Sequence, residues 1–342
     1  MIKIYNFNIF YEIIKILLII IPLLICVAYL TYIERKIIAW LHLRVGPNRV
    51  GFKGLLQPIA DTLKLIFKEI IIPKKSNKIL FHIAPIITIM PTLTAWAIIP
   101  FGPKLIFTNL NTGLLFIIAI TSIEVYGIIF AGWSSNSKYA FLGAMRAAAQ
   151  MISYEITMSF SLIIVILLTK SVKLIKIVNF QNNGFFAKKL GLNFLSWNCF
   201  LIFPIFIIYF ISGIAKTNRH PFDVVEGESE IVAGYMVEYS GMLFAIFFLS
   251  EYTNIILISI LTTLIFLGGW IAPIKILNFI PNFFWLGIKT FFLIFIFIWI
   301  RGTLPRYRYD QIMKLNWKFF LPITFICFII IATILQINIF KK

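Results

Sequence analysis

Long apolar runs are the feature that most restricts what this chain can fold into. About eight stretches reach or approach the ~20 apolar residues that a helix needs to cross a bilayer. The chain has 342 residues, of which 61% are hydrophobic, and a soluble protein of this length could not cover so much apolar surface. We therefore expect an all-α polytopic membrane protein with one integral membrane domain over residues 1–342. The expected spans are 9–33, 79–100, 112–132, 143–169, 197–215, 238–262, 284–300 and 319–338.

One further stretch, residues 54–70, is expected to be helical without crossing the membrane. Its apolar residues share one helical face, and Gln57, Asp61, Lys64 and Lys68 occupy the other. This pattern is typical of an amphipathic helix that lies in the interface plane. It is interpreted either as a surface anchor or as a lip that admits a lipid-soluble molecule from the bilayer.

The charge and the metal-binding residue types exclude several classes of function. The net charge is +18, and most Lys and Arg lie in loops on one side of the expected spans. The positive-inside rule and anionic lipid headgroups account for this charge, so no nucleic-acid partner is expected. The three cysteines are far apart in apolar runs, and the three histidines lie at or outside span ends. We therefore expect no metal site and no redox centre in this chain.

Three glutamates, Glu124, Glu155 and Glu251, fall inside expected spans. An ionised carboxylate at mid-membrane costs about 2.5–3.5 kcal/mol even on a lenient insertion scale. Such a group is either an element of a proton relay or one half of a structural pair with a buried cation, for instance Arg146. The two interpretations are compatible.

A second concentration of acids lies at 217–237 and its border with the next span. Five of the chain's 13 acidic residues lie there: Asp223, Glu226, Glu228, Glu230 and Glu238. A solvated loop is the simple interpretation, but the interleaved apolar residues favour burial. Arg35, Arg219 and Arg301 are expected at the same membrane face. Coupled carboxylates near cations titrate as a group, so this loop can change its proton content when a neighbour changes charge.

Several long motifs resemble a known family. They are YIERKIIAWLHLRVGPNRVGFKGLLQPIADTLKLIFKE (32–69), GWSSNSKYAFLGAMRAAAQMISYEI (132–156), TNRHPFDVVEGESEIVAGYMVEYSG (217–241), EYTNI (251–255) and RYRYDQIMKLNWK (306–318). In this order they resemble the H-type membrane subunit of NADH:quinone oxidoreductase. That family is the bacterial form of the chain-1 membrane subunit of respiratory complex I.

The resemblance implies a fold, a substrate and partners. It implies eight spans plus the amphipathic helix, at the heel where the membrane arm meets the hydrophilic arm. The substrate would be a quinone, with ubiquinone as the expected species, whereas NADH, FMN and the iron–sulfur clusters would be on partner subunits. The expected partners are the quinone-site subunits of the hydrophilic arm, the small membrane subunits next to the antiporter-like ones, and membrane lipid. The bacterial inner membrane is the expected location, with the mitochondrial inner membrane as the alternative.

The resemblance also implies residue roles. The acidic residues that it implies for proton coupling are Asp223, Glu226, Glu228, Glu230, Glu238, Glu155 and Glu251. The charges around the quinone chamber are Arg35, Arg44, Asp61, Glu69, Arg146, Arg219 and Arg301. One departure stands out, because family members commonly have Glu before the T-N-R motif and this chain has Lys216.

The functional expectation is a quinone-chamber subunit that couples quinone reduction to proton translocation through buried carboxylates. Two alternatives remain open. The first is a proton-coupled secondary transporter that uses the intramembrane acids. The second is a structural anchor for the hydrophilic arm.

Overall fold

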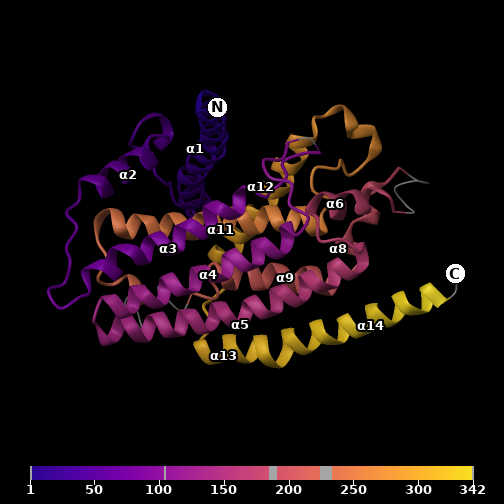
Figure 1. The fold of residues 1–342 in the computed structure, drawn as a ribbon. Coiled ribbons are helices and arrows are strands. Elements are labelled where there is room, and N and C mark those ends of the chain that lie inside the picture. Colours follow the sequence, from indigo (N-terminus) through magenta and orange to yellow (C-terminus); the bar gives the residue numbers. More distant parts are fainter. Residues whose placement is uncertain (1, 104, 185–190, 224–232, 341–342) are drawn as a thin grey trace.

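The computed structural model describes residues 2–103, 105–184, 191–223 and 233–340, and it is all-α over these ranges (Figure 1). Seven helical segments there are long and apolar enough to cross a membrane. They are α1 (Ile2–Leu41), α3 (Lys78–Trp96), α4 (Gly113–Ser134), α5 (Lys138–Thr169), α11 (Gly241–Phe266), α12 (Asn282–Thr303) and a last span of α13 (Tyr309–Leu315), the π-helical turn η5 (Asn316–Phe320) and α14 (Leu321–Phe340). The expected polytopic helical fold is confirmed.

The expected span at 197–215 is built differently from the others. It consists of the short α8 (Asn198–Leu201), a break at Ile202 and α9 (Phe203–Lys216). Pro204 lies in the first turn of α9, where its missing N–H costs little and its ring favours a new helix start. With 14 residues, α9 is about 21 Å long, shorter than the ~30 Å hydrocarbon core. Its last residue, Lys216, therefore lies inside the helical body rather than beyond it.

Short helices complete the described part of the chain. They are η1 (Phe52–Gly54), α2 (Gln57–Phe67), α6 (Leu174–Asn182), η2 (Asn193–Ser196), η3 (Gly234–Met236) and η4 (Lys275–Phe279). Of these, α2 corresponds to the expected amphipathic helix, and it is shorter than the expected 54–70. Its apolar side chains Ile59, Leu63, Ile66 and Phe67 are all exposed. The apolar face of α2 is thus left uncovered by the described residues of this chain.

The centre of the molecule is α11. It packs against α1, α2, α3, α6, α9 and α12, and from Ser250 to Phe266 it is buried on every side. A helix that is apolar all round belongs in such a position. Around it α3 packs on α4, α4 on α5 and α5 on α9, while α1 rises at a steep angle to these helices (Figure 1).

Side chains from other helices cap the buried end of α11. The amide of Gln181 donates to the carbonyl oxygens of Leu264 and Ile265 at 3.0 and 3.1 Å. The ammonium of Lys289 donates to three carbonyls just beyond the helix, at 2.7–3.0 Å, and lies 4.0 Å from the ring centroid of Trp197. The last carbonyls of a helix lack intrahelical partners, and these contacts satisfy carbonyls where water is excluded.

Small residues set the distances between neighbouring helices. A Cβ atom on Gly127 of α4 would lie 2.4 Å from Cγ2 of Thr88 on α3, and one on Gly132 would lie 2.3 Å from Cβ of Ala144 on α5. Close backbone approach through small residues is a common way for helices to associate in lipid. The positions of α3, α4 and α5 relative to each other depend on these glycines.

We expect Gly127→Ala to destabilise the protein, because the added methyl group overlaps Thr88. Overpacking of this kind costs about 1–3 kcal/mol. Gly287→Ala on α12 is the matched control, since nothing lies within 4 Å of its added Cβ. Thermal unfolding of the detergent-solubilised protein should show a lower midpoint for Gly127→Ala alone. Equal midpoints for the two variants would contradict the close packing of α3 on α4.

Candidate functional site

Three residues of α11, Glu251, Tyr252 and Asn254, direct polar groups at three different neighbours. Successive helical residues are rotated by about 100°, so a run of adjacent polar residues on a central helix must contact several surrounding helices. All three are buried. The polar side chains around them form two groups. Tyr252 and Glu251 belong to a first group around Glu34, and Asn254 belongs to a second group around Lys216.

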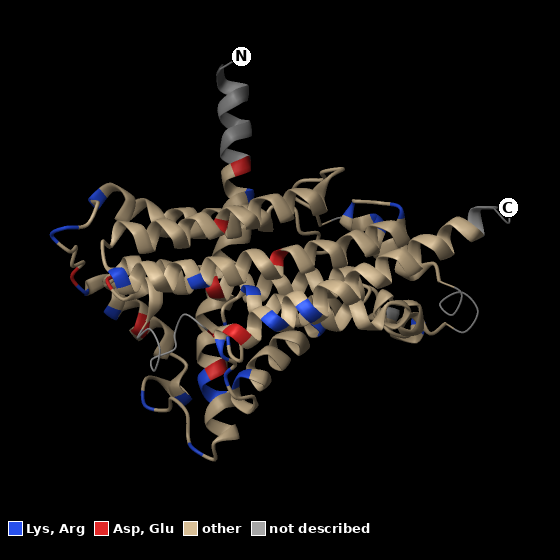
Figure 2. Ribbon diagram, turned by 90° about the horizontal axis from the view of Figure 1, so that it is seen from below, with Lys and Arg blue, Asp and Glu red and all other residues tan. Residues whose placement is uncertain are grey.

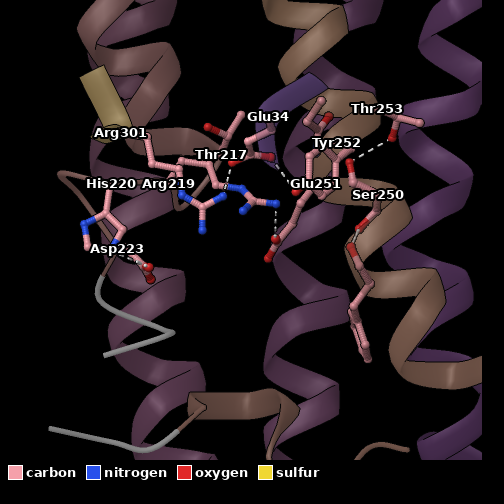
Figure 3. Close-up of polar contacts among 12 residues, drawn as sticks. Glu34, Thr217, Arg219, His220, Asp223, Ser250, Glu251, Tyr252, Thr253 and Arg301 are labelled. Atoms are coloured by element: carbon pink, nitrogen blue, oxygen red, sulfur yellow. Dashed lines mark hydrogen bonds and ion pairs between the residues drawn. The ribbon is translucent and has the colours of Figure 1, made fainter. Parts of the chain in front are cut away.

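In the first group, Glu34 of α1 is the common acceptor. Its Oε1 accepts a hydrogen bond from Arg301 of α12, and its Oε2 accepts one from the hydroxyl of Tyr252 at 2.6 Å (Figure 3). Glu34 is 5% exposed. The guanidinium and the phenol together compensate a carboxylate that has lost its water.

Arg219 connects this group to Glu251. Its guanidinium lies 4.4 Å from the ring centroid of Tyr252, and its Nη2 lies 3.6 Å from Oε2 of Glu251. The hydroxyl of Tyr235 donates to the other oxygen of Glu251 at 3.4 Å. Arg219 also lines a small cavity together with Glu34 and Arg301. Figure 3 shows Arg219 between the two carboxylates.

The turn after α9 positions Arg219. Gln150 of α5 donates to the carbonyl oxygens of Ala215 and Phe222 at 2.9 and 2.8 Å, so one buried side chain holds both ends of this turn. Within the turn, Nε2 of His220 lies 3.5 Å from Oδ2 of the buried Asp223. The guanidinium is therefore held by the fold rather than by its own flexible stem.

The second group gathers side chains from four helices around Lys216, the last residue of α9. The ammonium of Lys216 donates to Glu155 of α5 and to the hydroxyl of Thr121 on α4, both at 2.9 Å. The amide of Asn254 donates to Oε1 of Glu124 at 2.5 Å. Thr121 and Glu124 are three residues apart on α4, which places them on one face.

One small cavity joins the two groups, and a second lies within the Lys216 group. The first cavity is lined by Glu251, Tyr235, Glu124, Lys216 and Asn254. The second is lined by Glu155, Tyr209, Lys216 and Asn254. Lys216 and Asn254 belong to both. A buried polar path thus runs from Glu34 through Arg219 and Glu251 to the Lys216 group and ends at Glu155. Acidic positions inside the helical body as well as at its ends are visible in Figure 2.

Of the residues that the sequence singled out, five lie in this path: Glu124, Glu155, Glu251, Arg219 and Arg301. Arg35 and Asp61 form a separate, partly exposed pair with a 2.7 Å contact between α1 and α2. The remaining chamber candidates, all exposed on this chain, are Arg44, Glu69 and Arg146.

The expected acidic loop is described only at its ends. Asp223 is buried at its start and Glu238 is half-buried after it, whereas Glu226, Glu228 and Glu230 lie outside the described residues. Next to Glu238, Tyr239 stacks on Phe81 with ring centroids 4.0 Å apart. Burial raises the pKa of Tyr239 to about 12, so its hydroxyl stays protonated and 3.1 Å from Ser134.

Arg146 was the example of a buried cation that could pair with an intramembrane glutamate, but it is exposed on this chain and does not point toward Glu155. Nine residues separate them on α5, and at about 100° per residue they point in opposite directions. Arg146 is exposed, with its guanidinium 5.8 Å from the ring centroid of Tyr309. The partner of Glu155 is Lys216, which the sequence of α5 alone could not reveal.

Glu34, the acceptor of the first group, was missed. The expected first span ended at residue 33, which placed Glu34 with Arg35 and Lys36 in a loop. The structure continues α1 to Leu41, so Glu34 faces the interior while Arg35 points to the surface. The apolar residues that follow Lys36 are the signal that could have extended the helix.

In the ranges that the structure describes, no three His, Cys, Asp or Glu side chains gather in a way that could hold a metal ion. Three acids of the path are instead each paired with a cation, whereas Glu124 accepts from the amide of Asn254. The chemistry of the path is that of carboxyl, ammonium, guanidinium and phenol groups, which exchange protons and shift charge.

Comparison with known proteins identifies the family. The sequence model of the family described as NADH dehydrogenase matches residues 14–332. The H-type subunit of NADH-quinone oxidoreductase from Bordetella avium (strain 197N) is 60% identical over 328 residues, which cover 95% of this chain and 92% of that protein. Proteins of the same name from Methylibium petroleiphilum and Janthinobacterium sp. (strain Marseille) are also 60% identical, over 95% and 96% of this chain and 92% of each relative. The chain therefore belongs to the NADH dehydrogenase family, among the bacterial H-type subunits of NADH-quinone oxidoreductase.

Proposed function

We propose that this chain is the quinone-chamber subunit of a proton-pumping NADH:quinone oxidoreductase in the bacterial inner membrane. The observation that best supports the proposal is the series of mostly buried ionisable groups from Glu34 to Glu155, joined by direct contacts and by shared cavities. NADH, FMN and the iron–sulfur clusters belong to partner subunits in this proposal, and ubiquinone is the expected substrate. The chain itself supplies the quinone's route from the bilayer and the groups that respond to its reduction.

The route from the bilayer passes α2. Its apolar residues are uncovered, and Phe67 is 82% exposed. An isoprenoid quinone tail needs such a surface, because burial of apolar area against apolar side chains is favourable and unspecific. The contact between Arg35 and Asp61 fixes α2 to α1 and keeps this surface beside the path.

The walls of the chamber are completed by partners in this proposal. Arg44, Glu69 and Arg146 are exposed on the isolated chain, which suits residues that face the quinone-site subunits of the hydrophilic arm. The acidic loop, with Asp223 at its described end, lies next to Arg219 in sequence and carries the contact to that arm. The far end of the path, at Glu155, would face the small membrane subunits.

The path couples chemistry to proton movement through electrostatics. Reduction of a quinone to a quinol takes two electrons and two protons, so it changes the charge in the chamber until the protons arrive. A unit charge at 4 Å acts with about 4 kcal/mol at an effective dielectric of ~20. That is enough to alter the contacts of Arg301 and Arg219 with Glu34 and Glu251, and hence the proton content of Glu251 and the groups behind it.

Carboxamide substitution in the path tests the coupling role. We expect Glu34→Gln and Glu251→Gln each to lower NADH:quinone reductase activity or proton pumping of the assembled complex by about tenfold or more, which is ≥ ~1.4 kcal/mol. The physical reason is that an amide keeps the shape of the side chain and loses its charge and its proton. Both rates are measured on purified complex reconstituted in liposomes.

Glu12→Gln on the exposed part of α1 is the matched control, because its contact is a surface pair with Lys15. Wild-type rates and pumping in both path variants would refute the coupling role. A complex that fails to assemble, with normal activity in the fraction that does assemble, would instead support a structural anchor.

The route past α2 has a separate test. We expect Phe67→Ser to raise the KM for a long-tailed quinone about fivefold, corresponding to a lost contact of about 1 kcal/mol out of the 1.5–3 for full burial. The KM for a short-chain analogue should not change, since it does not need this surface. Lys64→Ser on the polar face is the control. Equal changes for both quinones would argue against a route along α2.

A further inference from the structure

Lys216 occupies an unusual position, because its ammonium contacts one carboxyl group and its side chain lines a cavity with a second. It donates to Glu155 at 2.9 Å and to Thr121 at 2.9 Å. It also lines the cavity that contains Glu124. Lys216 and Glu124 are 5% and 3% exposed, respectively. One cation thus contacts Glu155 and lies near a second acid, Glu124, with both Lys216 and Glu124 buried.

Glu124 is only half satisfied in this arrangement. Its Oε1 accepts from Asn254 at 2.5 Å, and its Oε2 is buried without a hydrogen-bond partner in the part of the chain that the structure describes. A buried ionised carboxylate with an uncompensated oxygen is costly. A proton on Glu124 would remove this cost while Lys216 contacts Glu155.

The charge balance of the group fixes how many protons it holds. Two carboxylates and one ammonium would leave one net negative charge, which burial disfavours, whereas adding one proton makes the group neutral. If the ammonium pairs with Glu124 instead, Glu124 ionises and the proton resides on Glu155. The two arrangements contain the same atoms and the same net charge.

We propose that Lys216 is a two-position switch whose ammonium alternates between Glu155 and Glu124 while one proton moves in the opposite direction. In one direction the O–H bond of Glu124 breaks, an O–H bond forms at Glu155, and the ammonium leaves Glu155 for Glu124. The reverse step restores the first state. No electron is transferred and no covalent bond other than O–H changes.

The geometry allows this movement. Lys216 and Asn254 line both cavities, so the side chain of Lys216 borders the space around each of the two acids. A lysine stem has four rotatable carbons and carries its charge as a compact point. The other titratable groups that line the cavities are Tyr209, Tyr235 and Glu251. Of these, Glu251 has a guanidinium partner of its own in Arg219.

The use of this switch as a step of proton translocation rests on the proposed function. It would pass a proton between the cavity that contains Glu251 and the cavity that contains Glu155, without building up charge in the membrane interior. The shared proton itself is a property of this chain and is measurable whether or not the complex pumps. Failure of the switch and failure of the proposed function can therefore be distinguished.

Infrared spectroscopy of the purified complex tests the switch through the carbonyl band of protonated carboxylic acids, identified by its H2O/D2O shift. We expect Glu124→Gln to lose the intensity of one carboxylic acid relative to wild type. Glu155→Gln should lose the same intensity, because the freed ammonium then pairs with Glu124 and ionises it. Lys216→Met should gain the intensity of one acid, because both carboxyls are then protonated.

The Glu155→Gln spectrum is decisive. If Lys216 pairs only with Glu155 and Glu124 is independent of it, the carboxylic-acid band of Glu155→Gln will keep its wild-type intensity. That result would overturn the proposal. An unchanged band in Glu124→Gln would overturn it too. If Glu155→Gln does not assemble, Glu155→Leu can replace it, and we expect it to lose the same intensity of one carboxylic acid. Ser159→Ala, in the same cavity as Glu155, is the control and should not change the band.

Discussion

Compensation of buried charge is the constraint on which the rest of this structure depends. Removing a carboxylate from water costs several kcal/mol unless a cation and hydrogen bonds replace the water. Glu34 meets this requirement with Arg301 and Tyr252, and Glu251 meets it with Arg219 and Tyr235. Each of these contacts joins different segments of the chain. The fold and the path of ionisable groups are therefore held by the same contacts.

The position of α11 explains why one helix serves both groups. It is buried on all sides, so polar residues on it can only contact other protein groups. Glu251 and Tyr252 contact the Arg219 side, while Asn254 reaches Glu124. Its far end is capped by Lys289 and Gln181, where the surroundings are apolar. One end of α11 thus supplies polar and ionisable side chains to the path, and the other end is fixed by capping contacts.

Lys216 changes the expected electrostatics of the path. The family resemblance leads one to expect a glutamate at this position, and a third acid beside Glu155 and Glu124 would add to their mutual repulsion. The ammonium instead pairs with Glu155 at 2.9 Å, and in the proposed switch the two acids share a single proton. Lys216 is the last residue of α9 and only 5% exposed, so its charge acts on the protein groups around it rather than on water.

The sequence alone determined the membrane class, most of the spans and the amphipathic α2, because hydropathy is a local property. Its motifs also singled out Glu155, Glu251, Arg219 and Arg301, which the structure places in the polar path. The sequence could not determine pairing. Whether Arg146 is exposed and whether Glu34 faces the interior depend on where each helix ends and on which of its faces packs against its neighbours. The contact of Lys216 with Glu155 joins residues 61 positions apart. Only the tertiary structure decided these partners, since a buried charge is stabilised by whatever the folded chain brings within a few ångströms of it.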